Sequence, residues 1–192
     1  MRTAELSVID LSANQEEPIV GCTYLVEERR PRQSLELCEK YAAEGANLMI
    51  ISRDPPLKIM EGSSFSPKRT LWITSIVGKE NLDPTAVGLL MNEIKKFIDQ
   101  TGKKAVVLID GLEYLISVNT YDRMLQFIHQ MRDIFVMSGS ILIIPIDTRT
   151  LSDREQALLE RNLQVVVPVS ASAEANGADG VLHISSGEGI GT

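Results

Sequence analysis

The chain has 192 residues, 44% of them hydrophobic and 23% charged, which is the composition of an ordinary globular domain. Its 19 Lys and Arg residues stand against 26 Asp and Glu residues, giving a formal net charge of -7 at pH 7. This acidic balance argues against a sequence-independent nucleic-acid binder, which needs a face rich in Lys or Arg. No apolar run approaches the roughly 18–20 residues of a membrane span, so we expect no insertion into a bilayer.

Cysteine and histidine are scarce, with Cys22, Cys38, His129 and His183 as the only examples. A zinc site needs four ligands at short spacing, so we predict no metal site of this kind. We interpret both cysteines as buried, reduced thiols. Residues 1–7 lack the apolar segment of a secretory signal, and we therefore expect a cytoplasmic protein.

From Gly21 onward, short β-prone runs alternate with runs whose apolar residues recur every three or four positions. This alternation predicts strands and helices in turn. In chain order, we predict a strand at 23–26, a helix between 34 and 45, a strand at 47–52, a loop with one helical turn at 57–69, a strand at 70–76, a helix between 83 and 102, a strand at 105–109, a helix at 120–138, a strand at 140–146, a short helix after 152 and a strand at 164–169.

Polar side chains ahead of three of these helices predict where each helix begins. Ser34 and Asp83 are each placed to cap a helix, the second with Pro84 at the first helical position. Ser152 and Glu155 have the spacing of a capping box, in which side chain and backbone bond reciprocally.

The order of elements predicts the fold class and the domain limits. Strands that are apolar throughout and alternate with helices predict an α/β fold with three layers, helices on both faces of a mostly parallel, doubly wound sheet. We place one domain at residues 20–169. Residues 1–19 are an N-terminal extension that can add an edge strand. Residues 170–192 are small and polar and predict a flexible tail, with 181–185 as an alternative edge strand.

Three segments in this order carry a family resemblance: residues 21–28 (GCTYLVEE), 51–56 (ISRDPP) and 108–115 (LIDGLEYL). Together with Leu159-Glu160-Arg161, they resemble the mostly archaeal domain-of-unknown-function family numbered eight-three-five, over roughly residues 20–168. That family has no established activity. The resemblance implies a diverged relative of the RecA/KaiC-type ATPases, and hence a RecA/KaiC-like fold.

The implied relationship can be tested against the chemistry of a P-loop. In a P-loop, glycine-rich backbone cradles the phosphates through its N–H groups, Lys contacts phosphate oxygens, and Ser or Thr holds Mg²⁺. The corresponding stretch here, residues 27–34 (EERRPRQS), has neither glycine nor lysine. Glu27 and Glu28 would repel a triphosphate, and Pro31 has no N–H to donate. We therefore predict that the phosphate cradle is absent.

Two further positions complete this comparison. KaiC-like ATPases carry a glutamate pair after the second strand that activates water, whereas this chain has Arg53-Asp54, and arginine cannot act as a general base. Asp110 ends an apolar strand, as a Mg²⁺-associated Walker B aspartate does. One carboxylate without its lysine and hydroxyl partners makes a poor Mg-ATP site. We therefore lean against an enzyme and predict no catalytic residues and no cofactor, with ATP or ADP kept as an alternative.

The first group of candidate site residues precedes the first long helix. Arg29, Arg30 and Arg32 form either a substitute anion site at the helix amino terminus or a solvated turn partly paired with Glu27 and Glu28. We favour the turn. Ser34 belongs to this group by position, and its role as a helix cap accounts for it.

The second group follows two other predicted strands: Arg53, Asp54, Asp110, Gly111, Glu113 and Tyr114. Arg53 and Asp54 lie where open α/β sheets bind ligands, although an ion pair that ties down the loop explains them more simply. For Asp110, we favour a cap on the Gly111 turn or an ion pair with Arg53 over a metal ligand. Glu113 and Tyr114 are included because the resemblance covers them.

Three functions remain open at this point. The leading hypothesis is a non-catalytic, pseudo-ATPase regulatory module that binds another protein in archaeal signalling, with self-association as a further option. The alternative is a nucleotide or anion sensor that binds without hydrolysis through the four candidate arginines. The third is an enzyme that uses Asp54, Asp110 and Glu113 around Mg²⁺ or Mn²⁺.

Overall fold

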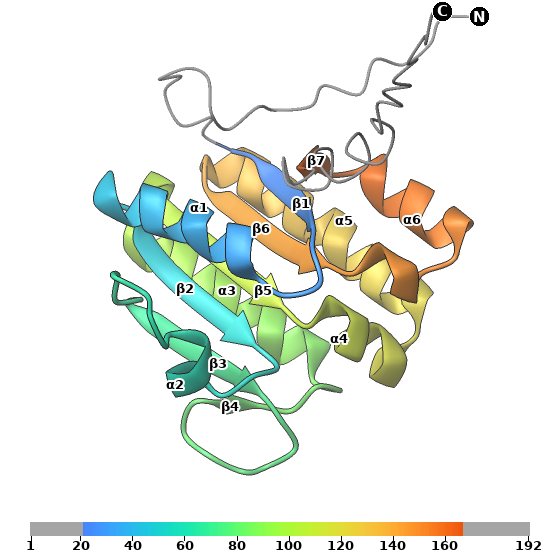
Figure 1. Cartoon of the computed structure of the whole chain (residues 1–192), viewed down its shortest axis with the longest axis horizontal. Helices are drawn as coiled ribbons and strands as arrows, with labels where there is room; N and C mark the ends of the chain where they lie inside the picture. The colour runs from blue at the N-terminus through green and yellow to red at the C-terminus, as the bar shows by residue number, and fades with distance from the viewer. Residues whose placement is uncertain (1–20, 167–192) are drawn as a thin grey trace, which may run out of the picture.

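The computed structural model of the chain describes residues 21–166. Its strands are β1 (Thr23–Glu27), β2 (Asn47–Ser52), β3 (Arg69–Ile73), β4 (Asn81–Leu82), β5 (Ala105–Asp110), β6 (Ile141–Ile146) and β7 (Gln164–Val166). They form one sheet in the order β4-β3-β2-β5-β6-β1-β7, and each neighbouring pair is parallel (Figure 1). This confirms the predicted α/β fold. The predicted N-terminal extension and C-terminal tail lie outside the described residues.

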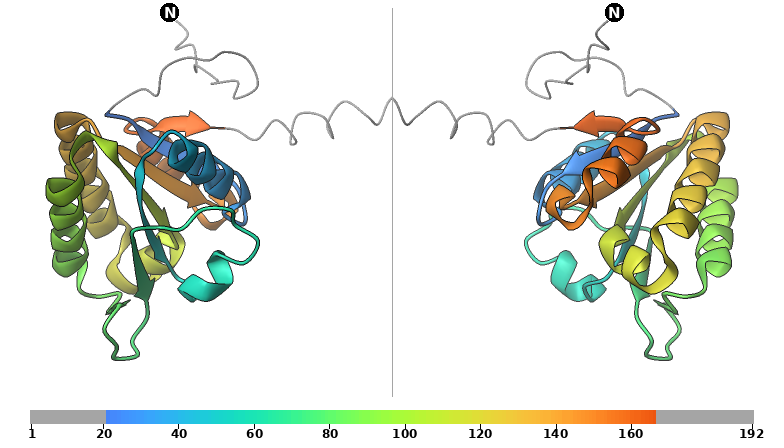
Figure 2. Two further views of the ribbon diagram at one scale, coloured as in Figure 1. Left: turned by 90° about the vertical axis from the view of Figure 1, so that its left-hand side faces the viewer. Right: turned by 90° about the vertical axis from the view of Figure 1, so that its right-hand side faces the viewer.

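Helices cover both faces of the sheet. They are α1 (Arg32–Ala43), α2 (Pro56–Ile59), α3 (Val87–Thr101), α4 (Leu112–Asn119), α5 (Tyr121–Ser138) and α6 (Asp153–Glu160). Buried side chains of α1 and α2 share one apolar cluster, whereas those of α3, α4, α5 and α6 share another. Figure 2 shows α1 on one side of the sheet and α3 and α5 on the other. The three predicted layers are confirmed.

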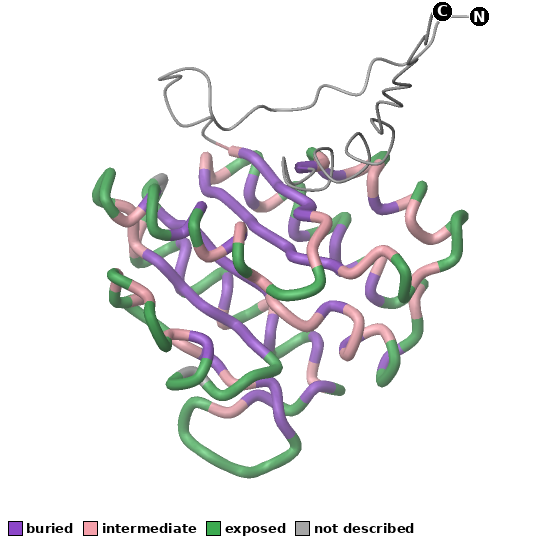
Figure 3. Tube along the Cα trace, viewed as in Figure 1, coloured by how far each residue is buried: buried purple, intermediate pink, exposed green. Residues whose placement is uncertain are grey.

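Alternation along the central strands explains why their sequences are apolar throughout. In β2, Leu48 and Ile50 pack into the cluster with α1, whereas Met49 and Ile51 pack into the cluster on the opposite face. Figure 3 shows β1, β2 and β6 buried along their length. A strand covered on both faces has no solvent-facing side, so its sequence shows no polar alternation.

Both described cysteines are free and buried, as predicted. Burial raises the pKa of the Cys38 thiol to about 12, which keeps it in the unreactive protonated form. Within residues 21–166, no helix is both long enough and apolar enough to cross a bilayer.

The predicted helix starts are right at one position and wrong at two. Ser152 and Glu155 form the predicted capping box, with both reciprocal hydrogen bonds present. Asp83 does not cap α3, because its carboxylate accepts instead from the Thr85 N–H at 2.8 Å and the Thr85 hydroxyl at 2.6 Å. Ser34 does not cap α1, since that helix begins two residues earlier.

Two other elements differ from the prediction. The strand predicted over 70–76 ends at Ile73 and is followed by a loop and the two-residue strand β4. Helix α4 was not predicted. It occupies only eight residues between Gly111 and Thr120, both of which have positive φ angles, so the sequence there is too short to show a clear helical period.

The topology decides where a site can form. After the carboxyl end of β1, the chain continues into α1 on one face of the sheet. After the neighbouring strand β6, it continues into α6, which packs with the helices on the other face. The neighbours β2 and β5 likewise lead to α2 and α4 on opposite faces. In open α/β sheets, ligands bind at such switch points. The loops after β1, β2, β5 and β6 all emerge at this carboxyl edge of the sheet.

Candidate functional site

The ten candidate residues from the sequence all lie at the carboxyl edge of the sheet, in two groups. One group spans the β1–α1 connection and the first turn of α1, and the other lies at and just after the ends of the neighbouring strands β2 and β5. Strand β6 lies between the two groups, and hydrogen bonds at its carboxyl end link it to both of them. The Glu28 N–H donates to the Ile146 carbonyl at 3.0 Å, and the Asp147 N–H donates to Glu113 Oε1 at 2.7 Å.

Glu28 occupies the amino terminus of α1. Its two carboxylate oxygens accept hydrogen bonds from the Gln33 N–H at 2.8 Å, from the Ser34 N–H at 2.9 Å and from the Ser34 hydroxyl. Burial raises the pKa of Glu28, while these donors act in the opposite direction. An internal carboxylate thus takes the place where a helix amino terminus would otherwise attract an external anion.

The first turn of α1 has no backbone donor left for a phosphate. The N–H groups of Gln33 and Ser34 bond to Glu28, that of Arg32 bonds to the Arg30 carbonyl, and that of Leu35 bonds to the Pro31 carbonyl. Of the four positions whose N–H groups a helix leaves free at its start, Pro31 has no N–H, and Arg32, Gln33 and Ser34 are the three bonded here, whereas the Leu35 bond is the first one within the helix. The hydrogen bonds to Glu28 therefore use the backbone donors that a phosphate at this helix terminus would need.

The three candidate arginines between residues 27 and 34 are all exposed. Arg32 forms an exposed ion pair with Glu36 along α1, at 3.5 Å. Arg29 and Arg30 are exposed, and their side chains form no ion pair within the described range 21–166. The predicted pairing of these arginines with Glu27 and Glu28 is wrong, because the Glu28 carboxylate is engaged at the helix terminus.

Asp110 is held by a serine of the neighbouring strand. The Ser52 hydroxyl donates to Asp110 Oδ2 at 2.7 Å and accepts from the Asp54 N–H at 3.0 Å. The predicted cap on Gly111 and ion pair with Arg53 are both wrong, since the Asp110 carboxylate makes neither. Burial raises the pKa of Asp110 to about 6, and the carboxylates of Glu113, Asp54 and Glu28 add to this rise. The Ser52 hydrogen bond opposes it.

The three carboxylates of the enzyme hypothesis have separate partners. Asp54 pairs with Lys58 of α2 at 3.0 Å, Asp110 bonds to Ser52, and Glu113 accepts from the Asp147 N–H. Among residues 21–166, no three His, Cys, Asp or Glu side chains are placed to hold a metal ion. This arrangement gives no support to the third alternative, an enzyme that uses Asp54, Asp110 and Glu113 around Mg²⁺ or Mn²⁺.

Arg53 contacts two aromatic residues, Trp72 near the end of β3 and Tyr114 in α4. Its guanidinium carbon is 4.4 Å from the centre of the Tyr114 ring, a cation–π contact, and Nη1 donates to the Ile73 carbonyl at 3.3 Å. The Arg53 carbonyl accepts from Trp72 Nε1 at 3.0 Å. The predicted ion pair between Arg53 and Asp54 is wrong. Trp72 was missed by the sequence analysis, although it is the chain's single tryptophan and lies near a strand end.

Gly111 allows this arrangement. It adopts φ +110°, and a Cβ atom at this position would lie 2.9 Å from the Arg53 Cβ. Residue 111 must therefore be glycine for α4 to begin this close to Arg53.

We expect Asp110→Asn to raise the free energy of unfolding above that of the unchanged chain at neutral pH, and to raise it less at pH 4.5. The pKa of Asp110 is higher in the folded state, about 6, than its ordinary value of 3.8, so folding favours the protonated form. The stability that protonated Asp110 gives the folded protein at low pH is therefore lost as the pH rises through about 6. This loss lowers the free energy of unfolding of the unchanged chain by at most about 3 kcal/mol. Urea unfolding of both proteins at pH 4.5, 6 and 7.5 measures the difference, and parallel pH curves would contradict the assignment.

The comparisons with known proteins agree with this fold. The family model described as "Protein of unknown function (DUF835)" matches residues 27–163, which include every candidate residue. The chain belongs to the DUF835 family. Among solved structures, it is similar to a protein described as "Structural study of Project ID PH0250 from Pyrococcus horikoshii OT3", with 15% identity, a TM-score of 0.52, and coverage of 79% of this chain and 84% of that one. This likeness concerns the fold alone. No curated protein matches the chain.

Proposed function

We propose that this DUF835 chain is a non-catalytic regulatory module that acts by binding another protein, in the cytoplasm and in archaeal signalling. The observation that carries the proposal is the Glu28 carboxylate at the amino terminus of α1. It uses the N–H groups that a bound phosphate would need, so a nucleotide would have to displace a partly buried internal anion. The buried free thiols support a reducing compartment.

The electrostatics of the edge support the same conclusion. Asp110 has its pKa raised to about 6 in the company of three other carboxylates, those of Glu28, Asp54 and Glu113. Residues 27–34 contain no P-loop lysine, and Arg32, one of the three arginines there, pairs with Glu36. A triphosphate beside Asp110 would meet the negative charge of these carboxylates, which argues against hydrolysis, whereas Arg29 and Arg30 keep the nucleotide or anion sensor as the alternative.

The RecA/KaiC-like relationship is part of this proposal. It is supported by where the three resembling segments lie. Glu28 and Arg53 follow β1 and β2, Asp110 is the last residue of β5, and all three lie at one edge of one parallel sheet. An ancestral ATPase site at this edge, with its phosphate cradle filled by Glu28, accounts for the retained Asp110 and for the missing P-loop.

Calorimetric titration with Mg-ATP and Mg-ADP tests the proposal. We expect no binding heat at high micromolar nucleotide and no ATP hydrolysis, because the α1 terminus is occupied. Arg30→Ala and Asp110→Ala are measured beside the unchanged chain. Binding that is lost in both variants would favour the nucleotide or anion sensor, and ATP hydrolysis that Asp110→Ala abolishes would refute the non-catalytic function.

A further inference from the structure

The loop between β3 and β4, residues 74–80, exposes two adjacent apolar side chains. Val77 is 99% exposed and Ile76 is 59% exposed. The loop extends beyond the carboxyl edge of the sheet, and Figures 1 and 3 show it as a projecting, exposed segment. Val77 buries almost no surface within its own chain, and Ile76 leaves more than half of its surface exposed. Their apolar area is therefore available to a partner.

Hydrogen bonds within the loop fix its backbone. The Ile76 N–H donates to Thr74 Oγ1 at 3.2 Å, and the Ile76 carbonyl accepts from Asn81 Nδ2 at 3.0 Å. The Asn81 N–H donates to the Gly78 carbonyl at 3.3 Å. A Cβ atom at position 78 would lie 2.5 Å from Asn81 Nδ2, so the backbone packs directly on that side chain. A loop held in this way loses little conformational entropy when its tip is bound.

The base of the loop carries the residue types that dominate protein interfaces. Trp72 and Ile73 lead into the loop, and Arg53 contacts both: its carbonyl accepts from the Trp72 indole and its guanidinium bonds to the Ile73 carbonyl. The same guanidinium stacks on Tyr114. Trp, Tyr and Arg are the residues most enriched among those that contribute most binding energy at interfaces.

Arg53 also has donors to spare. A guanidinium carries five N–H donors, and the side chain uses one of them on a backbone carbonyl. It forms no ion pair within the described part of the chain, although Asp54 is its neighbour. Stacking on Tyr114 holds the guanidinium in place, so its remaining donors are oriented to bind a carboxylate from outside.

We propose that the Ile76–Val77 tip and the Arg53, Trp72 and Tyr114 cluster form one docking surface. It fits a folded protein partner that offers an apolar pocket for the tip and a carboxylate at the rim for Arg53. The inference rests on the proposed protein-binding function and adds its surface and the chemistry of its partner.

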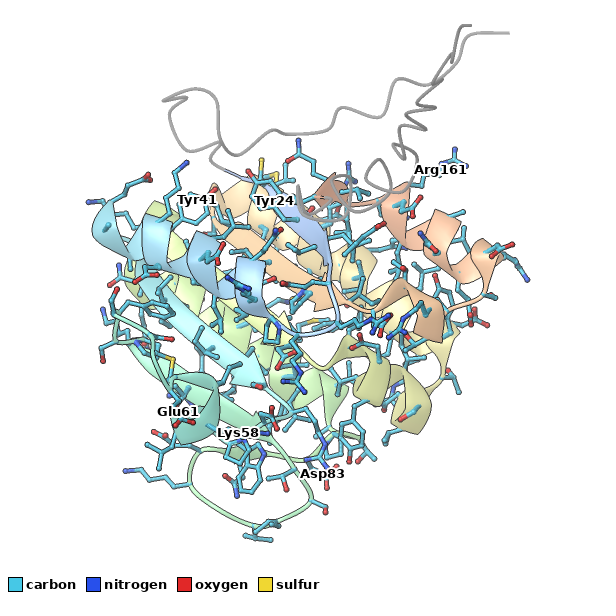
Figure 4. The ribbon with its side chains drawn as sticks, in the orientation of Figure 1. Tyr24, Tyr41, Lys58, Glu61, Asp83 and Arg161 are labelled. Atoms are coloured by element: carbon cyan, nitrogen blue, oxygen red, sulfur yellow. The ribbon has the colours of Figure 1, made fainter. Side chains whose placement is uncertain are left out.

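Charges near the tip are balanced rather than basic, with Lys79 beside Glu80, and Figure 4 shows Lys58 and Asp83 at the same end of the molecule. A loop tip that binds a membrane surface is expected to be surrounded by basic residues, so these balanced charges favour a protein partner.

Photo-crosslinking in the native cells, followed by titration, tests the surface. A benzoylphenylalanine is placed at position 77, and in a second chain at position 137. Met137 is the matched control, because it is 87% exposed and lies at the end of α5, before β6 begins at the opposite edge of the sheet. We expect a protein partner to crosslink at position 77 and not at 137.

The purified partner is then titrated against the unchanged chain and against Val77→Asp, Arg53→Gln and Met137→Asp. Because Val77 is fully exposed, Val77→Asp should keep the melting temperature of the unchanged chain. We expect at least a tenfold higher Kd for Val77→Asp and for Arg53→Gln, and a Kd within twofold for Met137→Asp.

Three results would overturn the surface. They are equal affinity for Val77→Asp, crosslinks at position 77 to lipid or to a second copy of this chain only, and no crosslinked protein at position 77. A partner whose affinity falls in Met137→Asp alone would place the binding surface elsewhere and leave the protein-binding function standing. Nucleotide binding or turnover in the calorimetric experiment would instead refute that function itself.

Discussion

Glu28→Ala should lower the free energy of unfolding by about 2–4 kcal/mol. The variant removes a carboxylate that accepts from two N–H groups and from the fully buried Ser34 hydroxyl. Hydrogen bonds to a charged acceptor are stronger than neutral ones, and the three donors would be left without their partner in a partly buried place. Urea unfolding at pH 7.5, followed by circular dichroism, measures the loss.

Glu36→Ala is the matched control for this effect. Glu36 is a glutamate of the same helix, and it is exposed and paired only with Arg32 at 3.5 Å. Exposed ion pairs of this kind contribute little, so we expect a change of less than about 0.5 kcal/mol. If Glu28→Ala is no more destabilising than Glu36→Ala, the carboxylate does not hold the start of α1, and it does not keep a phosphate from the N–H groups there.

Gly111→Ala should destabilise the protein by about 2–5 kcal/mol. The residue has φ +110°, which strains any L-amino acid with a Cβ atom, and the new methyl group would lie 2.9 Å from the Arg53 Cβ. Both effects act at the start of α4, so the variant should also weaken the stacking of Arg53 on Tyr114. Thermal unfolding measures the first effect, and the near-ultraviolet circular dichroism of the aromatic residues reports the second.

Gly88→Ala provides the contrast. Gly88 is exposed in the first turn of α3, and a Cβ atom there would meet nothing within 4 Å. Alanine favours the helix over glycine, so this variant should gain about 0.5–1 kcal/mol. Opposite signs for the two glycine substitutions are expected, and a destabilisation of similar size at both positions would show that the backbone at Gly111 is not special.

The elements with the longest patterns were predictable. Strand β2 was predicted at its observed bounds, because six consecutive uncharged residues are typical of a strand that is covered on both faces of a parallel sheet. Helix α5 was predicted within one residue at its start, since its 18 residues repeat an apolar face over five turns. The start of α3 failed for a physical reason. Asp83 can cap a helix or close a turn with Thr85, and the sequence contains both signals.

The place of the site was predictable, but its contacts were not. Carboxyl ends of parallel strands meet at one edge, so Arg53 and Asp110 were expected at the same edge of the sheet. Which side chain each one contacts depends on the order of strands in the sheet. Asp110 bonds to Ser52 because β5 lies beside β2, and no local pattern encodes that neighbourhood. The Glu28 carboxylate at the start of α1 depends in the same way on the path of a loop.

Strand β1 has a consequence for synthesis on the ribosome. It leaves the ribosome first among the described strands, yet it pairs only with β6 and β7, whose residues follow more than a hundred positions later. Until residues 141–146 emerge, the nascent chain carries an apolar segment with two unpaired edges, which is a template for pairing with other chains. Nascent chains cut before residue 141 should therefore require a chaperone to stay in solution, whereas those that extend past β7 should not.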